Sequence, residues 1–176
     1  MSRGPHQEPR RAQPEAPTST SRVPPTAPRP AHHRAGLALL VATGGALGSL
    51  GRFGLSRALP PQDGWPVGTL AANLTGAFLL GVLLEVLGRR GPETPGVQRV
   101  RLALGTGVLG GYTTFSSLAL ETERLLASGA VGTALGYAVV SLVAGVLCAA
   151  AGVAAVAAVA GRGRGTGATP PVGGAR

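Results

Sequence analysis

Residues 102–120 read LALGTGVLGGYTTFSSLAL, a stretch without a charged residue that is crowded with glycine and hydroxyl side chains. A soluble amphipathic helix would carry charges on its outer face, so this stretch is typical of a membrane span. Each glycine weakens a helix by about 1 kcal/mol, and the pair Gly110-Gly111 lies at the midpoint of the stretch. The sequence therefore predicts a transmembrane helix that is broken at mid-membrane.

Other uncharged stretches surround this one, at residues 35–51, 64–84 and 125–161. About 18 consecutive apolar residues indicate a candidate span, and the first stretch reaches this length if Arg52 extends its side chain to the headgroups or faces protein. The predicted helices are 36–55, 67–87, 100–126 and 131–160, separated by loops rich in proline and glycine. We expect an all-α membrane protein with four transmembrane helices.

The ends of the chain differ from its body in composition. Residues 1–35 are rich in Arg and Pro and have no apolar period, which predicts a disordered tail. Residues 161–176 read as a flexible C-terminal tail, so the channel-forming unit is expected at 36–160. The Arg residues flank apolar stretches, which fits contact with membrane lipid and does not fit a nucleic-acid-binding face. Every histidine lies in the N-terminal tail, so the apolar body lacks an acid–base couple for an enzyme.

Asn73 is the most informative single polar residue, because it falls near the centre of the uncharged stretch 64–84. A carboxamide there either holds two helices together by a hydrogen bond or donates N–H groups to an anion in a pore. Tyr137, Ser141 and Gly145 share one face of the last helix, and Arg52 either reaches the headgroups or attracts anions into a vestibule. Hydroxyl and amide donors dominate, and this favours an anion path, while carbonyls freed at a helix break suit a small hard cation.

These residues resemble three motifs of the Fluc (CrcB-type) fluoride channels. The motifs are Gly44-Gly45-Ala46-Leu47-Gly48 through Arg52, Gly68-Thr69-Leu70 with Asn73 and Gly76-Ala77-Phe78, and Gly107 with 110-GGYTTFS-116 and Glu121. The resemblance covers about residues 36–155. It implies a fluoride-selective passive channel in the plasma membrane, built as an antiparallel dimer with two pores and a structural sodium ion. The sodium ligands would be the carbonyls of Gly110 and Thr113, and the pore would be lined by Asn73, Thr114, Phe115, Tyr137 and Ser141.

Two positions depart from the family pattern. Leu118 stands where the family usually has a second Phe, and Gly145 stands where another hydroxyl is common. The uneven Arg distribution is a separate observation. It predicts a single orientation with both tails cytoplasmic, which favours a different, oppositely oriented homologue as the second subunit over a second copy of this chain. The main alternative function is a proton-coupled small multidrug exporter, which needs a carboxylate in the first helix, and residues 37–50 contain none.

Overall fold

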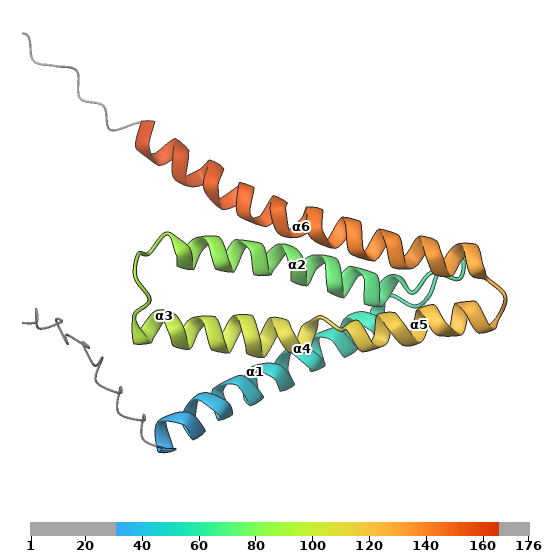
Figure 1. Ribbon diagram of the computed structural model, residues 1–176, viewed down its shortest axis with the longest axis horizontal. Helices are drawn as coiled ribbons and strands as arrows, with labels where there is room; N and C mark the ends of the chain where they lie inside the picture. Colours follow the sequence, from blue (N-terminus) through green and yellow to red (C-terminus); the bar gives the residue numbers. More distant parts are fainter. Residues whose placement is uncertain (1–30, 166–176) are drawn as a thin grey trace, which may run out of the picture.

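The computed structural model describes residues 31–165, and these residues form helices joined by short loops (Figure 1). α3, η1, α4 and α5 follow one another along one line, so the chain makes antiparallel passes and returns to the end where it began. The elements are α1 (Ala31–Ala58), α2 (Val67–Gly88), α3 (Pro95–Val100), the π-helix η1 (Arg101–Leu109), α4 (Gly110–Tyr112), α5 (Phe115–Ala127) and α6 (Val131–Gly165). The all-helical prediction is confirmed for the described residues.

Three of the helices are long and apolar enough to cross a membrane. They lie at Ala35–Ala58, Val67–Gly88 and Val131–Arg162. The remaining pass, which is the third along the chain, runs from Pro95 to Ala127. This third pass is divided into shorter pieces, none of which reaches the length of a span by itself. The molecule is therefore a multi-pass membrane protein.

The helix boundaries agree with the sequence patterns where proline and glycine mark the loops, as at both ends of α2. α1 begins at Ala31 and not at residue 36, and α6 continues to Gly165, past residue 160. These two helix ends therefore lie about five residues beyond the predicted helix ends. Neither helix contains a proline, so nothing in the backbone stops it at the predicted position. The rest of the predicted tails, residues 1–30 and 166–176, lies outside the described residues.

α1 packs against the third pass with almost no side chain between the two backbones. A Cβ atom added to Gly48 would collide with the Val108 carbonyl oxygen, and one added to Gly111 would collide with the carbonyl oxygen of Gly45. Small residues at such positions let membrane helices approach closely. This contact fixes η1 and α4 on one side of the helix bundle.

α2 and α6 approach each other in the same way on the opposite side. A Cβ on Gly81 would collide with the Ala149 carbonyl oxygen, and one on Gly152 with the carbonyl oxygen of Phe78. At the other end of α6, Trp65 from the α1–α2 loop packs edge-on against Tyr137, with ring centroids 6.3 Å apart. α2 is thus held between α6 and the third pass, which places its polar residues beside the junction of α4 and α5.

Candidate ion site at the helix interruption

The third pass is interrupted at two residues. Thr113 (φ −81°, ψ 156°) and Thr114 (φ −152°, ψ 119°) are extended, and a new helix begins at Phe115. The predicted break was centred on Gly110-Gly111, but both glycines are helical here. Gly111 packs closely against Gly45 of α1. The Thr113 N–H still donates to the Leu109 carbonyl at 2.9 Å, whereas the N–H and carbonyl of Thr114 have hydrogen-bond partners outside the helix. The interruption therefore lies a few residues later than the glycine pattern indicates.

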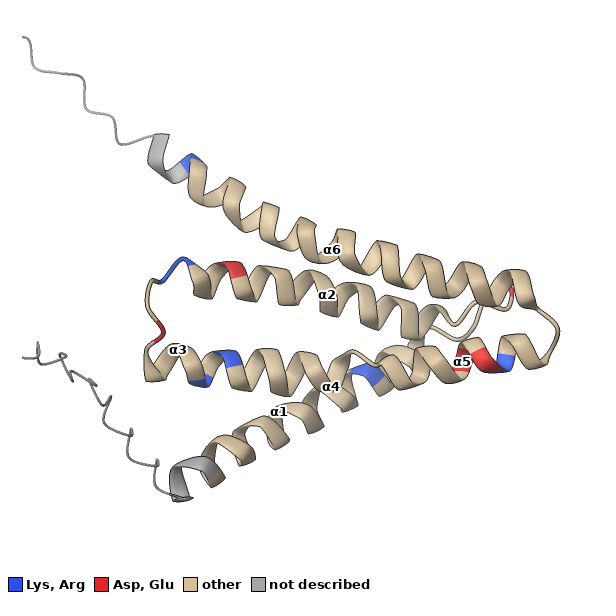
Figure 2. Ribbon diagram, viewed as in Figure 1, with Lys and Arg blue, Asp and Glu red and all other residues tan. Residues whose placement is uncertain are grey.

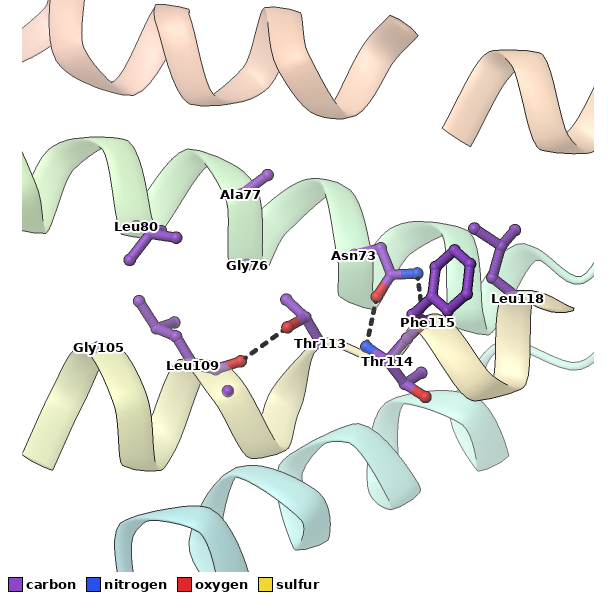
Figure 3. A pocket seen from close by; sticks show the side chains of 11 residues that line it. Asn73, Gly76, Ala77, Leu80, Gly105, Leu109, Thr113, Thr114, Phe115 and Leu118 are labelled. Carbon is purple, nitrogen blue, oxygen red and sulfur yellow. Dashed lines mark hydrogen bonds between the residues drawn. The ribbon is translucent and has the colours of Figure 1, made fainter. Parts of the chain in front are cut away.

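Asn73 of α2 supplies those partners (Figure 3). Its Nδ2 donates to the carbonyl oxygen of Thr114 at 3.0 Å, and its Oδ1 accepts from the Thr114 N–H at 2.8 Å. The carboxamide thus takes the place of a neighbouring strand and satisfies both backbone groups of the extended residue. Of the two roles that its position allowed, the structure shows the interhelical hydrogen bonds. One Nδ2 hydrogen remains beyond this pair of bonds.

This pairing releases carbonyl oxygens on the preceding turn. In a continuous helix the Thr114 N–H would donate to the Gly110 carbonyl and the Ser117 N–H to the Thr113 carbonyl. Instead Thr114 N–H donates to Asn73, and Ser117 N–H donates to the Thr114 Oγ1 at 3.1 Å. The carbonyls of Gly110 and Thr113 consequently lose their helical donors.

Arg52 approaches the same turn from α1. Its Nε donates to the Gly111 carbonyl at 3.4 Å, and the Ser49 hydroxyl donates to the same oxygen at 3.3 Å. The partly buried guanidinium of Arg52 therefore satisfies a carbonyl that the interruption would otherwise leave without a donor. This contact places a positive charge directly behind the interruption.

A cavity of 390 Å³ opens beside the interruption, between α2 and the third pass. In Figure 3 the Asn73 side chain points from α2 toward the third pass, and the Thr113 side chain points from the third pass toward α2. Phe115 and Leu118 lie at one end of the cavity. Gly76 lets this wall approach closely, because a Cβ there would collide with the Thr113 methyl group. The residues that line the cavity include Asn73, Gly76, Gly110, Thr113, Thr114, Phe115 and Leu118.

A second, larger groove of 750 Å³ runs between α5 and α6 and shares Asn73, Phe115 and Leu118 with the cavity. Most of its wall is apolar. Ser141 also lines it, and its Oγ is buried with no hydrogen-bond partner among the described residues. Phe115 is 81% exposed. The groove therefore presents an unsatisfied hydroxyl and an uncovered aromatic ring on the same surface.

Tyr137 does not line this groove. It is fully buried, and its hydroxyl donates to Glu121 Oε2 at 2.6 Å, while Thr69 Oγ1 donates to Glu121 Oε1 at 2.6 Å. Glu121 and Thr69 were not predicted as site residues. The available signal was Glu121 itself, the first carboxylate after the uncharged stretch, at a depth where it needs donors.

The structure thus gathers Asn73, Thr114 and Phe115 at the interruption, with Ser141 on the wall of the adjoining groove and the Gly110 and Thr113 carbonyls on the preceding turn. Arg52 and Tyr137 lie behind this surface and contact it through Gly111 and Glu121, respectively. Within the described residues there is no cluster of three or more His, Cys, Asp or Glu side chains that could hold a metal ion. Backbone oxygens are the cation ligands that this region offers.

Comparison with known proteins identifies the chain's relatives. The family described as "CrcB-like protein, Camphor Resistance (CrcB)" matches residues 39–153. "Fluoride-specific ion channel FluC 1" of Cutibacterium acnes is 47% identical over 125 residues, covering 70% of this chain and 87% of that protein. "Fluoride-specific ion channel FluC 2" of Leifsonia xyli subsp. xyli is 43% identical over 130 residues, 74% of this chain and 90% of that protein. The resemblance seen in the motifs is therefore confirmed, and the chain belongs to the CrcB-like family.

Proposed function

We propose that this protein is the subunit of a passive, fluoride-selective channel that lowers cytoplasmic fluoride by export across the plasma membrane. The observation that carries the proposal is the similarity to relatives that are each named a fluoride-specific ion channel, over 82–90% of the length of three of them. The three helices that are long and apolar enough to cross a membrane are consistent with a channel subunit. The protein is a transport protein and not an enzyme.

The alternative of a proton-coupled multidrug exporter is not favoured. Such an exporter needs a carboxylate within its first span to exchange protons for substrate, and the charged side chains of α1 that the structure describes are Arg52 and Arg57. The relatives named as fluoride channels give this alternative no support.

The α5–α6 groove is our candidate for the fluoride path. Fluoride holds its hydration shell strongly, so a path must replace water with donors that have no other acceptor. The unpartnered Ser141 hydroxyl and the second Nδ2 hydrogen of Asn73 meet this requirement. Phe115 can present the positive edge of its ring to an anion, while the hydroxyl of Thr114 lies one residue away along the chain. Tyr137 would act from behind the groove, by holding Glu121 through its hydroxyl.

The carbonyls of Gly110 and Thr113 are our candidate ligands for a structural sodium ion. The donor set fits, because unwound backbone carbonyls at a helix break coordinate sodium in membrane proteins, and Asn73 takes away the N–H group that would otherwise occupy Gly110. One subunit offers two such oxygens, so a second subunit would complete the coordination. A bound sodium ion would supply positive charge that holds two interruptions together at mid-membrane.

An antiparallel second subunit is the third part of the proposal. Within residues 31–165, the exposed Phe115 ring and the open α5–α6 groove lack a covering element. Only features at mid-depth meet their counterparts when two subunits lie antiparallel, because the two-fold axis then lies in the membrane plane. The interruption of the third pass would be such a feature. The third pass, Pro95–Ala127, would have to cross the membrane as well, which brings the number of spans to four.

We further propose that this second subunit is a different homologue. Figure 2 shows that blue residues concentrate at the end of the molecule that carries the α2–α3 loop. Cytoplasmic ends of spans are rich in Arg and Lys, so this bias favours one orientation, and an opposite orientation calls for a mate of opposite bias. The described Arg residues at this end are Arg89, Arg90, Arg99, Arg101 and Arg162, against Arg57 and Arg124 at the other.

Fluoride efflux from liposomes tests the function. The full chain, reconstituted together with a homologue of opposite Arg bias, should release fluoride but neither chloride nor a cationic dye, and the chain reconstituted alone should release fluoride more slowly. Efflux of the dye driven by a proton gradient would instead establish the exporter. Fluoride release by the lone chain at the rate of the mixture would overturn the heteromeric part of the proposal and leave the channel function standing.

A further inference from the structure

A crevice lies between the beginning of α1 and α3, away from the interruption. It has a volume of 300 Å³ and is lined by Gly36, Leu37, Leu40 and Arg99. α1 contacts η1 closely at Gly44 and diverges from the third pass toward its own N-terminal end (Figure 1). A Cβ added to Gly36 would meet no atom within 4 Å. The crevice is therefore open, with two leucines and a single cation on its walls.

The cation in this crevice has no acidic partner among the described residues. Arg89 pairs with Glu85 at 2.7 Å and Arg101 with Glu93 at 2.7 Å, which uses the two carboxylates that the structure describes at this end of the molecule. Arg99 forms no ion pair with a described residue, and Arg90 carries a further positive charge on the neighbouring loop. The potential at the mouth of the crevice consequently favours an anion.

We propose that this crevice binds the headgroup and upper acyl chain of an anionic phospholipid. A guanidinium forms two parallel hydrogen bonds to a phosphate, and Arg99 lies level with the end of the span Ala35–Ala58, where lipid headgroups lie. Leu37 and Leu40 provide an apolar wall that suits an acyl chain and offers nothing to a soluble phosphate. Basic pockets between transmembrane helices bind anionic headgroups in this way.

The proposed lipid site is separate from the proposed ion path, because the crevice shares no residue with the interruption or with the α5–α6 groove. Its occupant would fill the space where α1 leaves the third pass. A lipid there would hold the N-terminal part of α1 against α3, which the glycine contacts farther along α1 cannot do. Lipid binding can accordingly be measured without measuring fluoride transport.

The test is native mass spectrometry of the full chain, purified in detergent as it assembles and titrated with phosphatidylglycerol or phosphatidylcholine. We expect Arg99→Gln to weaken phosphatidylglycerol binding about fivefold, because one Arg near an anionic lipid contributes about 1 kcal/mol. Arg90→Gln is the matched control, since it removes the same charge at the same end without altering the crevice. It should weaken binding less than twofold. Binding of phosphatidylcholine, whose choline cation offsets the charge of its phosphate, should be weaker than that of phosphatidylglycerol and less affected by Arg99→Gln.

Three results would overturn the proposal. Equal losses for Arg99→Gln and Arg90→Gln would mean that the lipid responds to diffuse surface charge. Equal affinity for the two lipids would mean that the headgroup charge is not recognised. Displacement of phosphatidylglycerol by inorganic phosphate at the same concentration would mean that the crevice is a phosphate site without a role for its apolar wall.

Discussion

Replacing Asn73 with Ala removes both hydrogen bonds that hold the interruption open. The Thr114 N–H and carbonyl lose partners at 2.8 Å and 3.0 Å in a partly buried position. The N–H has an alternative, because it can return to the Gly110 carbonyl as in a continuous helix. The Thr114 carbonyl loses Asn73 as a donor, but as the N-cap of α5 it still accepts the first hydrogen bond of that helix. We therefore expect Asn73→Ala to rewind the helix by one hydrogen bond and to remove Gly110 from the set of free carbonyls.

The expected loss of stability follows from this count of bonds. One bond is exchanged for another of the same kind, and one further bond to the Thr114 carbonyl is lost, which costs about 0.5–1.5 kcal/mol. A net interhelical hydrogen bond in a membrane protein averages about 0.6 kcal/mol, so the low end of this range is the safer figure. The effect on fluoride flux should be larger than the effect on stability, because rewinding moves Thr114 and Phe115 as well as the freed carbonyl.

The assay compares fluoride efflux from liposomes with the free energy of unfolding in mixed micelles for three variants. Asn73→Asp keeps the acceptor for the Thr114 N–H but loses the donor to the Thr114 carbonyl and carries a charge into the span. It should therefore lose at least as much stability as Asn73→Ala, and its carboxylate should repel fluoride and suppress flux at least as strongly. Thr75→Val is the control, because it removes a hydroxyl on the same helix that bonds Tyr112 and leaves Asn73 intact. Wild-type flux together with wild-type stability in Asn73→Ala would refute the reasoning.

Three further predictions concern packing, the buried carboxylate and orientation. Gly48→Ala should destabilise the protein by about 1–3 kcal/mol, because the new methyl group strikes the Val108 carbonyl, whereas Gly54→Ala, with open space around it, should not destabilise it; equal denaturation midpoints would disprove this. Tyr137→Phe removes a donor to Glu121 and should lower stability by about 1–3 kcal/mol, measured by thermal unfolding; an unchanged midpoint would show that the bond is dispensable. A reporter fused to the C-terminus of the lone chain should report the cytoplasmic side alone, and a mixed signal would contradict a single orientation.

Features that depend on local pattern were predictable from the sequence. The ends of α2 follow from the Pro-rich loop before Val67 and from the charged, Gly-containing segment after Leu87. The start of α1 and the end of α6 lie several residues beyond their predicted positions, since residues 31–35 and 161–165 contain no proline that would stop a helix. A sequence predicts the end of a helix only where it contains a residue, such as proline, that a helix cannot accommodate.

Pairings between distant parts of the chain were beyond the sequence. The position of Asn73 indicated that it needs a partner, yet Thr114 is 41 residues away and offers backbone groups, which no side-chain pattern reveals. The same holds for Glu121, whose donors come from the α2 residue Thr69 and the α6 residue Tyr137. The glycines at 110 and 111 indicated a weak helix, but the hydrogen bonds from Asn73 determine the residue at which the helix is interrupted.

The interruption also divides the electric dipole of the third pass. Aligned peptide groups give a helix about half a positive charge at its N-terminus and half a negative charge at its C-terminus. A continuous helix would place both poles near the membrane surfaces, where water weakens them. Here η1 and α4 end at Tyr112 and α5 begins at Phe115, so a negative and a positive pole stand back to back inside the molecule. One polypeptide segment thereby offers adjacent attractions for a cation and for an anion, and Arg52 offsets part of the negative pole through its bond to the Gly111 carbonyl.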